Sequence, residues 1–543
     1  MSSDHRRFIG GAWITGLGTL ASRVLGLLRD IATAALLGLA SSGVMDALVV
    51  AVRIPNLFRR IFGEGALTAS FVPAFAAVRE RSIDDGWKLA SAVLVWLTAV
   101  LTGIVLVAEL LLGIAWLWAH DNASVSLLIA LVAANLPYVV TICVACLLGA
   151  TLQAVGRFTV AAWAPTLLNI CWLAAAWLVA PRVSSDKVVQ AWVIVASIQI
   201  AGLLQALVHL PALRAVGFRF TYDWQSSRAS VLKIGKSIAA VAFGLAITQI
   251  NTLLDSMIAW VLAAAPDGAT SVSWLGGVAY PMRAGAAAAI YYGERFYQLP
   301  VGILGFAIAT AIFPLLSRHA AKGDHRLLGA DLTIAIRVAL FTSVPAGVGL
   351  VLLAKPVAHL IYQHGAFTAD DAARTARMIA AYSTAVWAFC TTPVVVRGFF
   401  AHGDQITPMR IGLVAVIVNM LLDFSLVWPL AEVGLALSTA FAAVLQLTML
   451  LALFHRRFGS LEWSGLMRST VRILAATAVM GVAVLAVLQR LPPRVDWTSQ
   501  AISLVAAIAV GAGVYVAAAW VLRSPELPLL FHRGLPSETH PTR

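Results

Sequence analysis

The feature that most constrains this chain is a set of charged residues embedded in apolar sequence between residues 22 and 73. The set consists of Arg23, Arg29, Asp30, Asp46, Arg53, Arg59, Arg60 and Glu64. A charge at the centre of a bilayer costs roughly 3 kcal/mol, so membrane helices that carry this many must turn them toward a wet interior. In the second helix-length segment, spacings of three and four residues place Asp46, Asn56 and Glu64 on one stripe with Arg53 and Arg60. The sequence therefore predicts two helices that line a polar cavity.

The composition supports a membrane protein. Of the 543 residues, 60% are hydrophobic and only 12% are charged, which is too little polar sequence to coat a globular surface of this size. The net charge of +13 is spread over short loops, which favours anionic lipid headgroups over nucleic acid as its counterpart. We find no HExxH, GxSxG or Walker A motif, so the sequence indicates neither an enzyme nor an ATP-driven pump.

Apolar segments of about twenty residues or more predict fourteen membrane helices. They lie near residues 9–38, 43–75, 89–118, 123–153, 159–181, 188–213, 234–264, 286–316, 328–354, 373–400, 409–430, 434–455, 469–489 and 499–522. With this numbering most Lys and Arg residues of the loops fall on one side of the membrane. The positive-inside rule then predicts that both termini are cytoplasmic.

An internal repeat relates the two halves. L-Q-A-V-G-R-F-T at 152–159 is echoed by F-A-H-G-D-Q-I-T at 400–407, and a weaker echo relates residues 63–75 to residues 305–317. Six helices separate the repeats, so both halves are expected to enter the membrane in the same sense. We predict an all-α integral membrane protein in which two parallel-related six-helix halves surround a central polar cavity, followed by two further C-terminal helices.

Two stretches near the N-terminus carry a family resemblance. SRVLGLLRD at 22–30 and MDALVVAVRIPNLFRRIFGEGALTASFVPAF at 45–75 resemble the signature of the MurJ/MviN family of lipid II flippases, within the multidrug/oligosaccharidyl-lipid/polysaccharide exporter superfamily. Similar segments continue at 156–170, 291–317, 363–372 and 399–408. The resemblance implies transport of undecaprenyl-diphosphate-linked disaccharide pentapeptide across the bacterial inner membrane by alternating access.

The resemblance and the repeat together suggest a division of the chain. We expect an N-terminal lobe at 1–220, a C-terminal lobe at 221–458, a groove for the lipid tail formed by the helices of 459–523, and a disordered cytoplasmic tail at 524–543. The expected partners are lipid II, membrane lipids and the cell-wall synthesis machinery. The protein is expected to act as a monomer.

Arginine is the residue expected to recognise the substrate, because its planar guanidinium makes bidentate contacts to phosphate and stays charged when partly desolvated. The substrate-binding candidates are Arg23, Arg29, Asp46, Arg53, Asn56, Arg59, Glu64, Glu294 and Arg295. The family resemblance implies that four of these arginines (Arg23, Arg29, Arg59 and Arg295) and Asp46 are functionally required. Pairing of Arg29 with Asp30, or of Arg295 with Glu294, is an open structural alternative, whereas Arg23 and Arg59 lack an obvious local partner.

A cation site is the second candidate. Asn419 and Asp423 lie four residues apart on one predicted helix, and Asn251 and Asp255 repeat this spacing on another. The resemblance implies Na⁺ ligands at Asp255, Asn419, Asp423 and Thr439. Na⁺ would then be a coupling ion, although membrane potential alone could drive the transport cycle. The structural alternative is that these side chains form a hydrogen-bonded polar patch between packed helices.

Two other functions remain open from the sequence. A drug/cation antiporter of the same superfamily would carry fewer cavity arginines, because its substrates are cationic. A flippase for another polyprenyl-linked glycan would need the same arginines.

Overall fold

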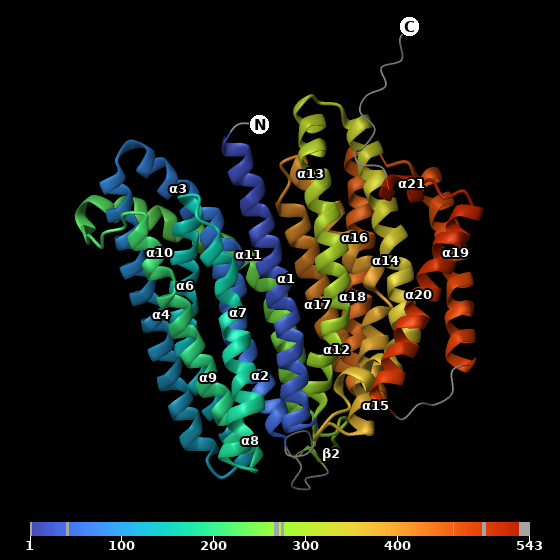
Figure 1. Cartoon of the computed structure of the whole chain (residues 1–543), viewed down its shortest axis with the longest axis horizontal. Helices are drawn as coiled ribbons and strands as arrows, with labels where there is room; N and C mark the ends of the chain where they lie inside the picture. Colours follow the sequence, from blue (N-terminus) through green and yellow to red (C-terminus); the bar gives the residue numbers. More distant parts are fainter. Residues whose placement is uncertain are drawn as a thin grey trace. The chain divides into compact units, whose positions relative to one another are not determined.

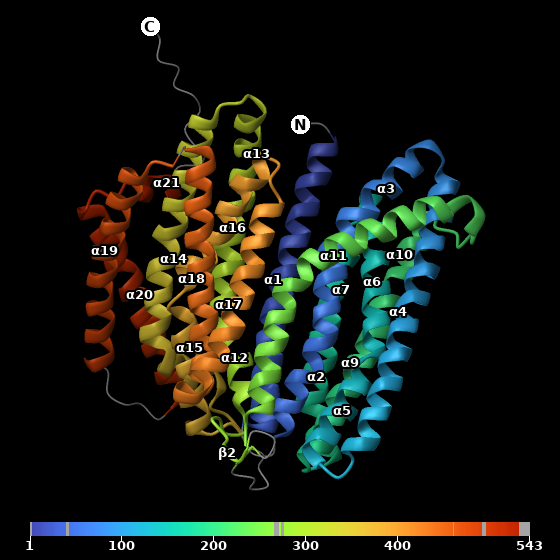
Figure 2. The ribbon, with the colours of Figure 1, turned by 180° about the vertical axis from the view of Figure 1, so that it is seen from behind.

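The computed structural model describes residues 3–39, 43–264, 271–272, 276–459, 461–490 and 496–531. Almost all of them are helical (Figures 1 and 2). The chain divides into two compact units, one of Met1–Ala288 with His364–Thr368 and one of Ala289–Gln363 with Ala369–Arg543. The division falls inside a helix, and the lobes expected from the repeat at 1–220 and 221–458 stay a prediction.

The first unit contains α1 (Ser3–Leu37), α2 (Val44–Phe58), η1 (Arg59–Ala66), α3 (Leu67–Arg81), α4 (Ile83–Ala119), α5 (Ala123–Asn135), α6 (Pro137–Ala154), α7 (Thr159–Ala174), η2 (Ala175–Val179), α8 (Ala180–Val183), α9 (Lys187–Leu207), α10 (His209–Ala215) and α11 (Trp224–Val261). Strands β1 (Ser271–Val272) and β2 (Val278–Ala279) follow as an antiparallel pair. Figure 2 shows the first part of α11 running across the end of this unit where α3 and α4 meet, before the helix turns along the bundle.

Helix α12 (Ala286–Pro300) begins at the end of the first unit and continues into the second. The second unit then contains η4 (Val301–Gly305), α13 (Phe306–Ala321), α14 (His325–Tyr362), α15 (Ala369–Ser383), α16 (Val386–Ala401), α17 (Ile406–Leu430), α18 (Glu432–Phe458), α19 (Trp463–Arg490), α20 (Trp497–Val521) and α21 (Glu526–Phe531).

Within the described residues, eleven helical runs are long and apolar enough to cross a membrane, or twelve if α15 and α16 count as one bent span. These twelve coincide with twelve of the fourteen segments expected from the sequence. The other two segments, 9–38 and 234–264, coincide with α1 and α11, which are helical but outside that set. The all-helical membrane fold is confirmed, and the number fourteen stays a prediction.

One expected helix is broken. The segment 373–400 forms two helices, α15 and α16, that meet at an angle of 41°. At the break the hydroxyl of Thr384 donates to the carbonyl of Ala381 at 2.7 Å. A side-chain bond of this kind offers the backbone an alternative to helical hydrogen bonding, and it marks where the helix ends.

Polar side chains fix the starts of several helices. The hydroxyl of Ser82 accepts a hydrogen bond from the Asp85 amide at the start of α4. The side-chain oxygen of Asn122 accepts one from the Val125 amide at the start of α5. Asp186, Asp223, Asp324 and Asp496 cap α9, α11, α14 and α20. Each cap satisfies an amide that has no partner within its helix, so these positions set the register of the spans.

A π-helix interrupts the equivalent span of each repeat. Gly63 and Gly305, which the sequence echo pairs, are 242 residues apart. Helix η1 begins at Arg59 and η4 begins at Val301, the same 242 residues apart. A π-helix is rare and often lies at a functional site, so its recurrence at one offset supports the repeat independently of the sequence echo.

The C-terminal end departs from expectation. Residues 524–543 were expected to be disordered, but α21 is helical, and the Glu526 side chain is buried between α14 and α19. Its carboxylate accepts from Arg337 at 2.6 Å, from Ser469 at 2.7 Å and from Ser524 at 2.6 Å. A buried carboxylate that accepts hydrogen bonds from three side chains is satisfied. The Pro-rich composition of this segment does not indicate these bonds. Residues 532–543 lie outside the described part of the chain.

Candidate functional site

Arg29 lies at the centre of a hydrogen-bonded network between α1 and α7. Its guanidinium donates to the Asp30 carboxylate at 2.7 and 3.0 Å and to Oδ1 of Asn169 at 3.2 Å. It also lies over the Trp172 ring, 4.5 Å from the ring centroid. The alternative that pairs Arg29 with Asp30 is therefore present in the structure, and Arg29 also ties two helices together.

Two residues of this network, Asn169 and Trp172, are not among the site candidates drawn from the sequence. The Asn169 amide donates to the carbonyl and hydroxyl of Ser22, and the Trp172 indole donates to Thr33 at 3.0 Å. Close helix packing makes these bonds possible. A Cβ on Gly18 of α1 would lie 2.7 Å from the Ala162 carbonyl oxygen, so only glycine permits this approach. The glycine in α1 is the sequence signal that could have indicated the α1–α7 contact.

Asp46 holds the start of α12. One carboxylate oxygen accepts from the Gly285 amide at 2.6 Å and the other from the Ala288 amide at 2.8 Å. Gly285 has a φ of +91°, a left-handed conformation that favours glycine. A carboxylate at a helix N-terminus satisfies free amides and complements the helix dipole. These two hydrogen bonds tie Asp46 of α2 to the start of α12.

The remaining candidates of this span lie on α2 and η1. Arg53 is buried, and Asn56 and Arg59 are partly buried. The Asn56 side-chain oxygen accepts from Nε of Arg59 at 3.5 Å, and Arg60 donates to Gln249 of α11 at 3.2 Å. The polar strip expected from the spacing therefore runs from an α-helix into a π-helix, and its single face stays a prediction. The side chain of Glu64 lies outside the described residues.

Arg23 differs from Arg29, the other arginine candidate of α1. It is exposed on α1, and no side-chain hydrogen bond or ion pair of Arg23 occurs among the described residues. Six residues on, Arg29 is only 8% exposed. One helix thus carries one arginine engaged in packing and one that is accessible.

In the second unit Glu294 and Arg295 lie on α12. Glu294 is buried, and Arg295 is partly buried, with its guanidinium 4.2 Å from the centroid of the Tyr291 ring. The offset of 242 residues that relates the two π-helices also relates Arg53 to Arg295. Each repeat therefore places an arginine six residues before its π-helix.

The candidate cation ligands of the second unit lie on α17 and α18. Asp423 is fully buried and accepts from the Asn419 amide at 2.9 Å and from the Ser438 hydroxyl. Thr439 donates to the Leu435 carbonyl at 3.0 Å. The structure brings Asn419 and Asp423 of α17 into contact with Ser438 of α18, which the sequence pattern did not single out. Thr439 is the next residue of α18.

The other candidate acid lies in the first unit. Asp255 is 2% exposed on α11, and its carboxylate lies 3.5 Å from the amide of Asn251. Among the described residues, no group of three or more His, Cys, Asp or Glu side chains could hold a metal ion. Carboxylate, amide and hydroxyl oxygens suit a hard cation better than a transition metal.

The structure has two helical units and many membrane spans, and it buries arginines and carboxylates within them. These features define a class: a multi-pass membrane transporter for a polar substrate. The family model described as "Lipid II flippase MurJ" matches residues 33–506 of this chain. The chain belongs to the MurJ lipid II flippase family, as the resemblance implied. It is a transporter and not an enzyme.

Relatives match nearly the whole chain. A probable lipid II flippase MurJ of Vibrio cholerae serotype O1 is 30% identical over 531 residues, covering 94% of this chain and 95% of the relative. A lipid II flippase MurJ of Burkholderia cenocepacia is 29% identical over 522 residues, covering 93% of this chain and 95% of the relative.

Solved structures show the same fold. A lipid II flippase MurJ in an inward closed conformation aligns with a TM-score of 0.72 and 20% identity, covering 95% of this chain and 99% of that chain. An inward-facing multidrug resistance MATE transporter of the MOP superfamily aligns with a TM-score of 0.60 and 14% identity, covering 80% and 94% of the two chains. Both likenesses are of fold alone, and the second does not favour the antiporter alternative.

Proposed function

We propose that this protein moves lipid II, the undecaprenyl-diphosphate-linked disaccharide pentapeptide, from the inner to the outer leaflet by alternating access. The observation that carries the proposal is the match of the flippase family over residues 33–506. Intramembrane arginines on α1, η1 and α12 support it, because a diphosphate needs cationic, forked donors inside the membrane. The polyprenyl tail would stay in lipid, along the helices of 459–523.

We assign different roles to the candidate residues. Arg23 and Arg59 of the first unit and Arg295 of the second are proposed to contact the diphosphate, with Arg53, Asn56, Glu64 and Glu294 completing the polar lining. The exposure of Arg23 supports this assignment. Arg29 and Asp46 are proposed to position α1, α7 and the start of α12, since their charged atoms already bond to Asp30, Asn169 and two backbone amides.

Complementation tests the function. A bacterial strain depleted of its own lipid II flippase should grow with normal shape when it expresses this protein. Arg59→Ala should fail to support growth at equal membrane abundance, and Arg182→Ala, which removes an exposed arginine from α8, should support it. Lysis of the strain expressing the wild-type protein at normal abundance would contradict the proposed substrate.

A coupling ion is a separate proposal. We infer that a Na⁺ ion binds at Asn419, Asp423 and Thr439 with Asp255, and that Ser438 adds a hydroxyl. The oxygen donors of these side chains fit a hard cation, and a buried carboxylate such as Asp423 requires compensation of its charge. Na⁺, compared with K⁺ or choline, should raise the Tm of the purified protein, and Asp423→Ala should remove the shift. Equal Tm values in all three cations would exclude the site.

We further propose that the protein works as a monomer in the bacterial inner membrane, with both termini in the cytoplasm and with access to the cell-wall synthesis machinery. The distribution of loop Lys and Arg residues supports this orientation.

A further inference from the structure

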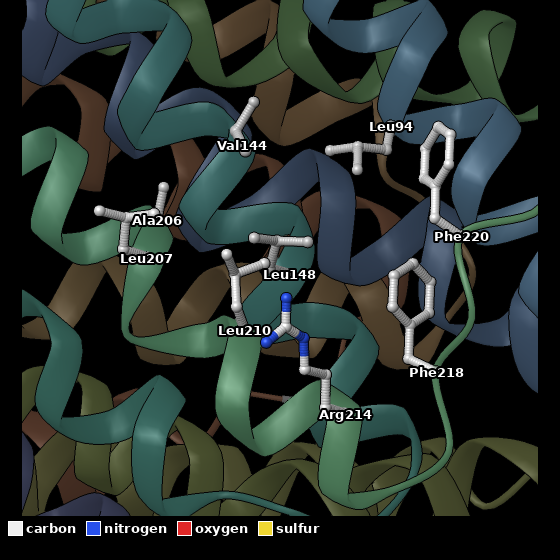
Figure 3. A pocket seen from close by; sticks show the side chains of 9 residues that line it. All are labelled: Leu94, Val144, Leu148, Ala206, Leu207, Leu210, Arg214, Phe218 and Phe220. Carbon is white, nitrogen blue, oxygen red and sulfur yellow. The ribbon is translucent and has the colours of Figure 1, made fainter.

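The first unit contains an apolar cavity of about 390 Å³ that shares no residue with the candidate site (Figure 3). Its walls come from α4, α6, α9, α10 and the segment that follows α10. The lining is aliphatic and aromatic, and Arg214 is the single charged residue among the described residues that line it. An apolar cavity of this size with one oriented charge has the features of a ligand site.

One wall of the cavity is held rigidly. Helix α10 ends at Ala215 and is followed by Gly217, whose φ is +83°. The amide of Phe218 donates to the Leu213 carbonyl at 3.0 Å. This backbone bond is typical of a helix that glycine terminates. A hydrophobic contact often accompanies it, and here Phe218 packs against the cluster that contains Leu213. The Phe218 ring packs edge-on against Trp87 of α4, with the centroids 5.4 Å apart. The wall is therefore formed before any ligand binds.

The cavity is continuous with an exposed apolar surface. Leu207 is 46% exposed and Phe220 is 59% exposed, and both line the cavity. Leu203, one turn before Leu207 on α9, is also exposed. Because α9 and α10 form one of the apolar spans, Leu203 and Leu207 are expected to face the acyl chains of the bilayer. A chain of methylenes could enter the cavity without leaving hydrocarbon.

The charge in the cavity is available for a ligand. Arg214 lies in the last turn of α10, and its guanidinium points among Leu148 and Leu210 (Figure 3). No side-chain hydrogen bond or ion pair of Arg214 occurs among the described residues. Arg219 lies in the segment that follows α10 and is also exposed. A guanidinium beside an apolar cavity, within a basic segment at a membrane surface, is complementary to a lipid phosphate.

We propose that this cavity binds one anionic glycerophospholipid, with an acyl chain against Leu148 and Leu210 and the phosphate on Arg214. Binding would link α4, α6 and α9 through the lipid and stabilise the first unit, because a ligand that binds only the folded state raises its stability. The site is separate from the proposed path of lipid II, so its occupancy can be measured without a transport assay.

Native mass spectrometry of the full-length protein, titrated with phosphatidylglycerol or phosphatidylcholine, tests the proposal. Phosphatidylglycerol should bind to the wild type with at least tenfold higher affinity than to Arg214→Gln, which corresponds to about 1.4 kcal/mol. Ala206→Trp should also weaken binding, because the indole fills the cavity that Ala206 lines. Arg228→Gln is the matched control, since it removes a nearby exposed arginine that does not line the cavity, and it should bind as the wild type does.

Cross-linking locates the lipid. A phosphatidylglycerol with a diazirine on its acyl chain should label peptides of α6 and α10 in the wild type and lose that labelling in Ala206→Trp. Equal affinity of the wild type and Arg214→Gln for phosphatidylglycerol would overturn the proposal. Equal affinity of the wild type for phosphatidylglycerol and phosphatidylcholine would also overturn the proposal. Labelling confined to helices other than α6 and α10 would overturn it as well.

Discussion

At the scale of single residues, the charged side chains of one helix separate into two kinds. Arg29 is buried and bonded to Asp30 and Asn169, whereas Arg23 is exposed. The same residue type in the same helix is therefore engaged in packing at one position and exposed at the other. Stability and transport should respond differently to the two substitutions.

Arg29→Ala should lower the Tm of the purified protein, because it leaves the buried Asp30 carboxylate without its cation. Breaking a buried pair in this way costs about 3–5 kcal/mol in soluble proteins. Arg23→Ala should leave the Tm within a degree or two of wild type while abolishing transport. Thermal unfolding in detergent measures both, and a destabilised Arg23→Ala with a normal Arg29→Ala would reverse the assignment.

Glu526 predicts a pH dependence. Burial acts to raise the pKa of this carboxyl, but hydrogen bonds from Ser524, Ser469 and Arg337 outweigh it and hold the pKa below its usual value of 4.5. A carboxyl with a depressed pKa contributes stability that is present above the unfolded pKa and lost as pH falls through the folded pKa.

The Tm difference between wild type and Glu526→Gln should therefore be largest near neutral pH and should shrink below about pH 4.5. Glu462→Gln, which changes an exposed carboxyl near the start of α19, serves as the control and should show no such trend. A difference that grows on acidification would show that the buried carboxylate is not stabilised by its donors.

At the scale of helices, the contact between α1 and α7 depends on glycine. A Cβ at Gly18 would lie 2.7 Å from the carbonyl oxygen of Ala162, whereas a Cβ at Gly16 would meet nothing within 4 Å. Gly18→Ala should force α1 away from α7 and destabilise the protein by about 1–3 kcal/mol. Gly16→Ala should be neutral, and hydrogen exchange of α7 should rise only in the first variant. Equal hydrogen-exchange rates of α7 in the two variants would mean that the contact between α1 and α7 is not tight.

Sequence patterns predicted the helices well and the long-range contacts poorly. Spacings of three and four residues placed Arg53, Asn56 and Arg60 on one helix face, because helical geometry is local. The partner of Asp46 lies 239 residues away at Gly285, and no local pattern indicates a contact at that separation.

The Asn419 and Asp423 pair was predictable from spacing, but Ser438 came from a neighbouring helix. The α21 helix was missed since its stabilisation comes from Arg337 and Ser469 rather than from its own sequence.

At the scale of the whole molecule, the orientation in the membrane is the first expectation to test. Cysteines introduced at Asn122 and Asp496 should react with an impermeant maleimide in intact cells. Cysteines at Arg81, Asp324 and Arg457 should react only after the cells are opened. Labelling of Asp324→Cys from outside would contradict the number of spans and the cytoplasmic position of both termini.

The central claim is that intramembrane arginines carry the lipid II diphosphate across the bilayer. Its most direct test reconstitutes the purified protein in liposomes with fluorescent lipid II and measures the fraction of label that an impermeant quencher can reach over time. Wild-type protein should expose the inner-leaflet lipid II to the quencher. Variants carrying Arg23→Ala, Arg59→Ala or Arg295→Ala should insert normally and leave that fraction protected, and Arg59→Lys should restore it only in part, because lysine supplies charge without the forked geometry. Wild-type rates in all three alanine variants at equal reconstitution would contradict the account.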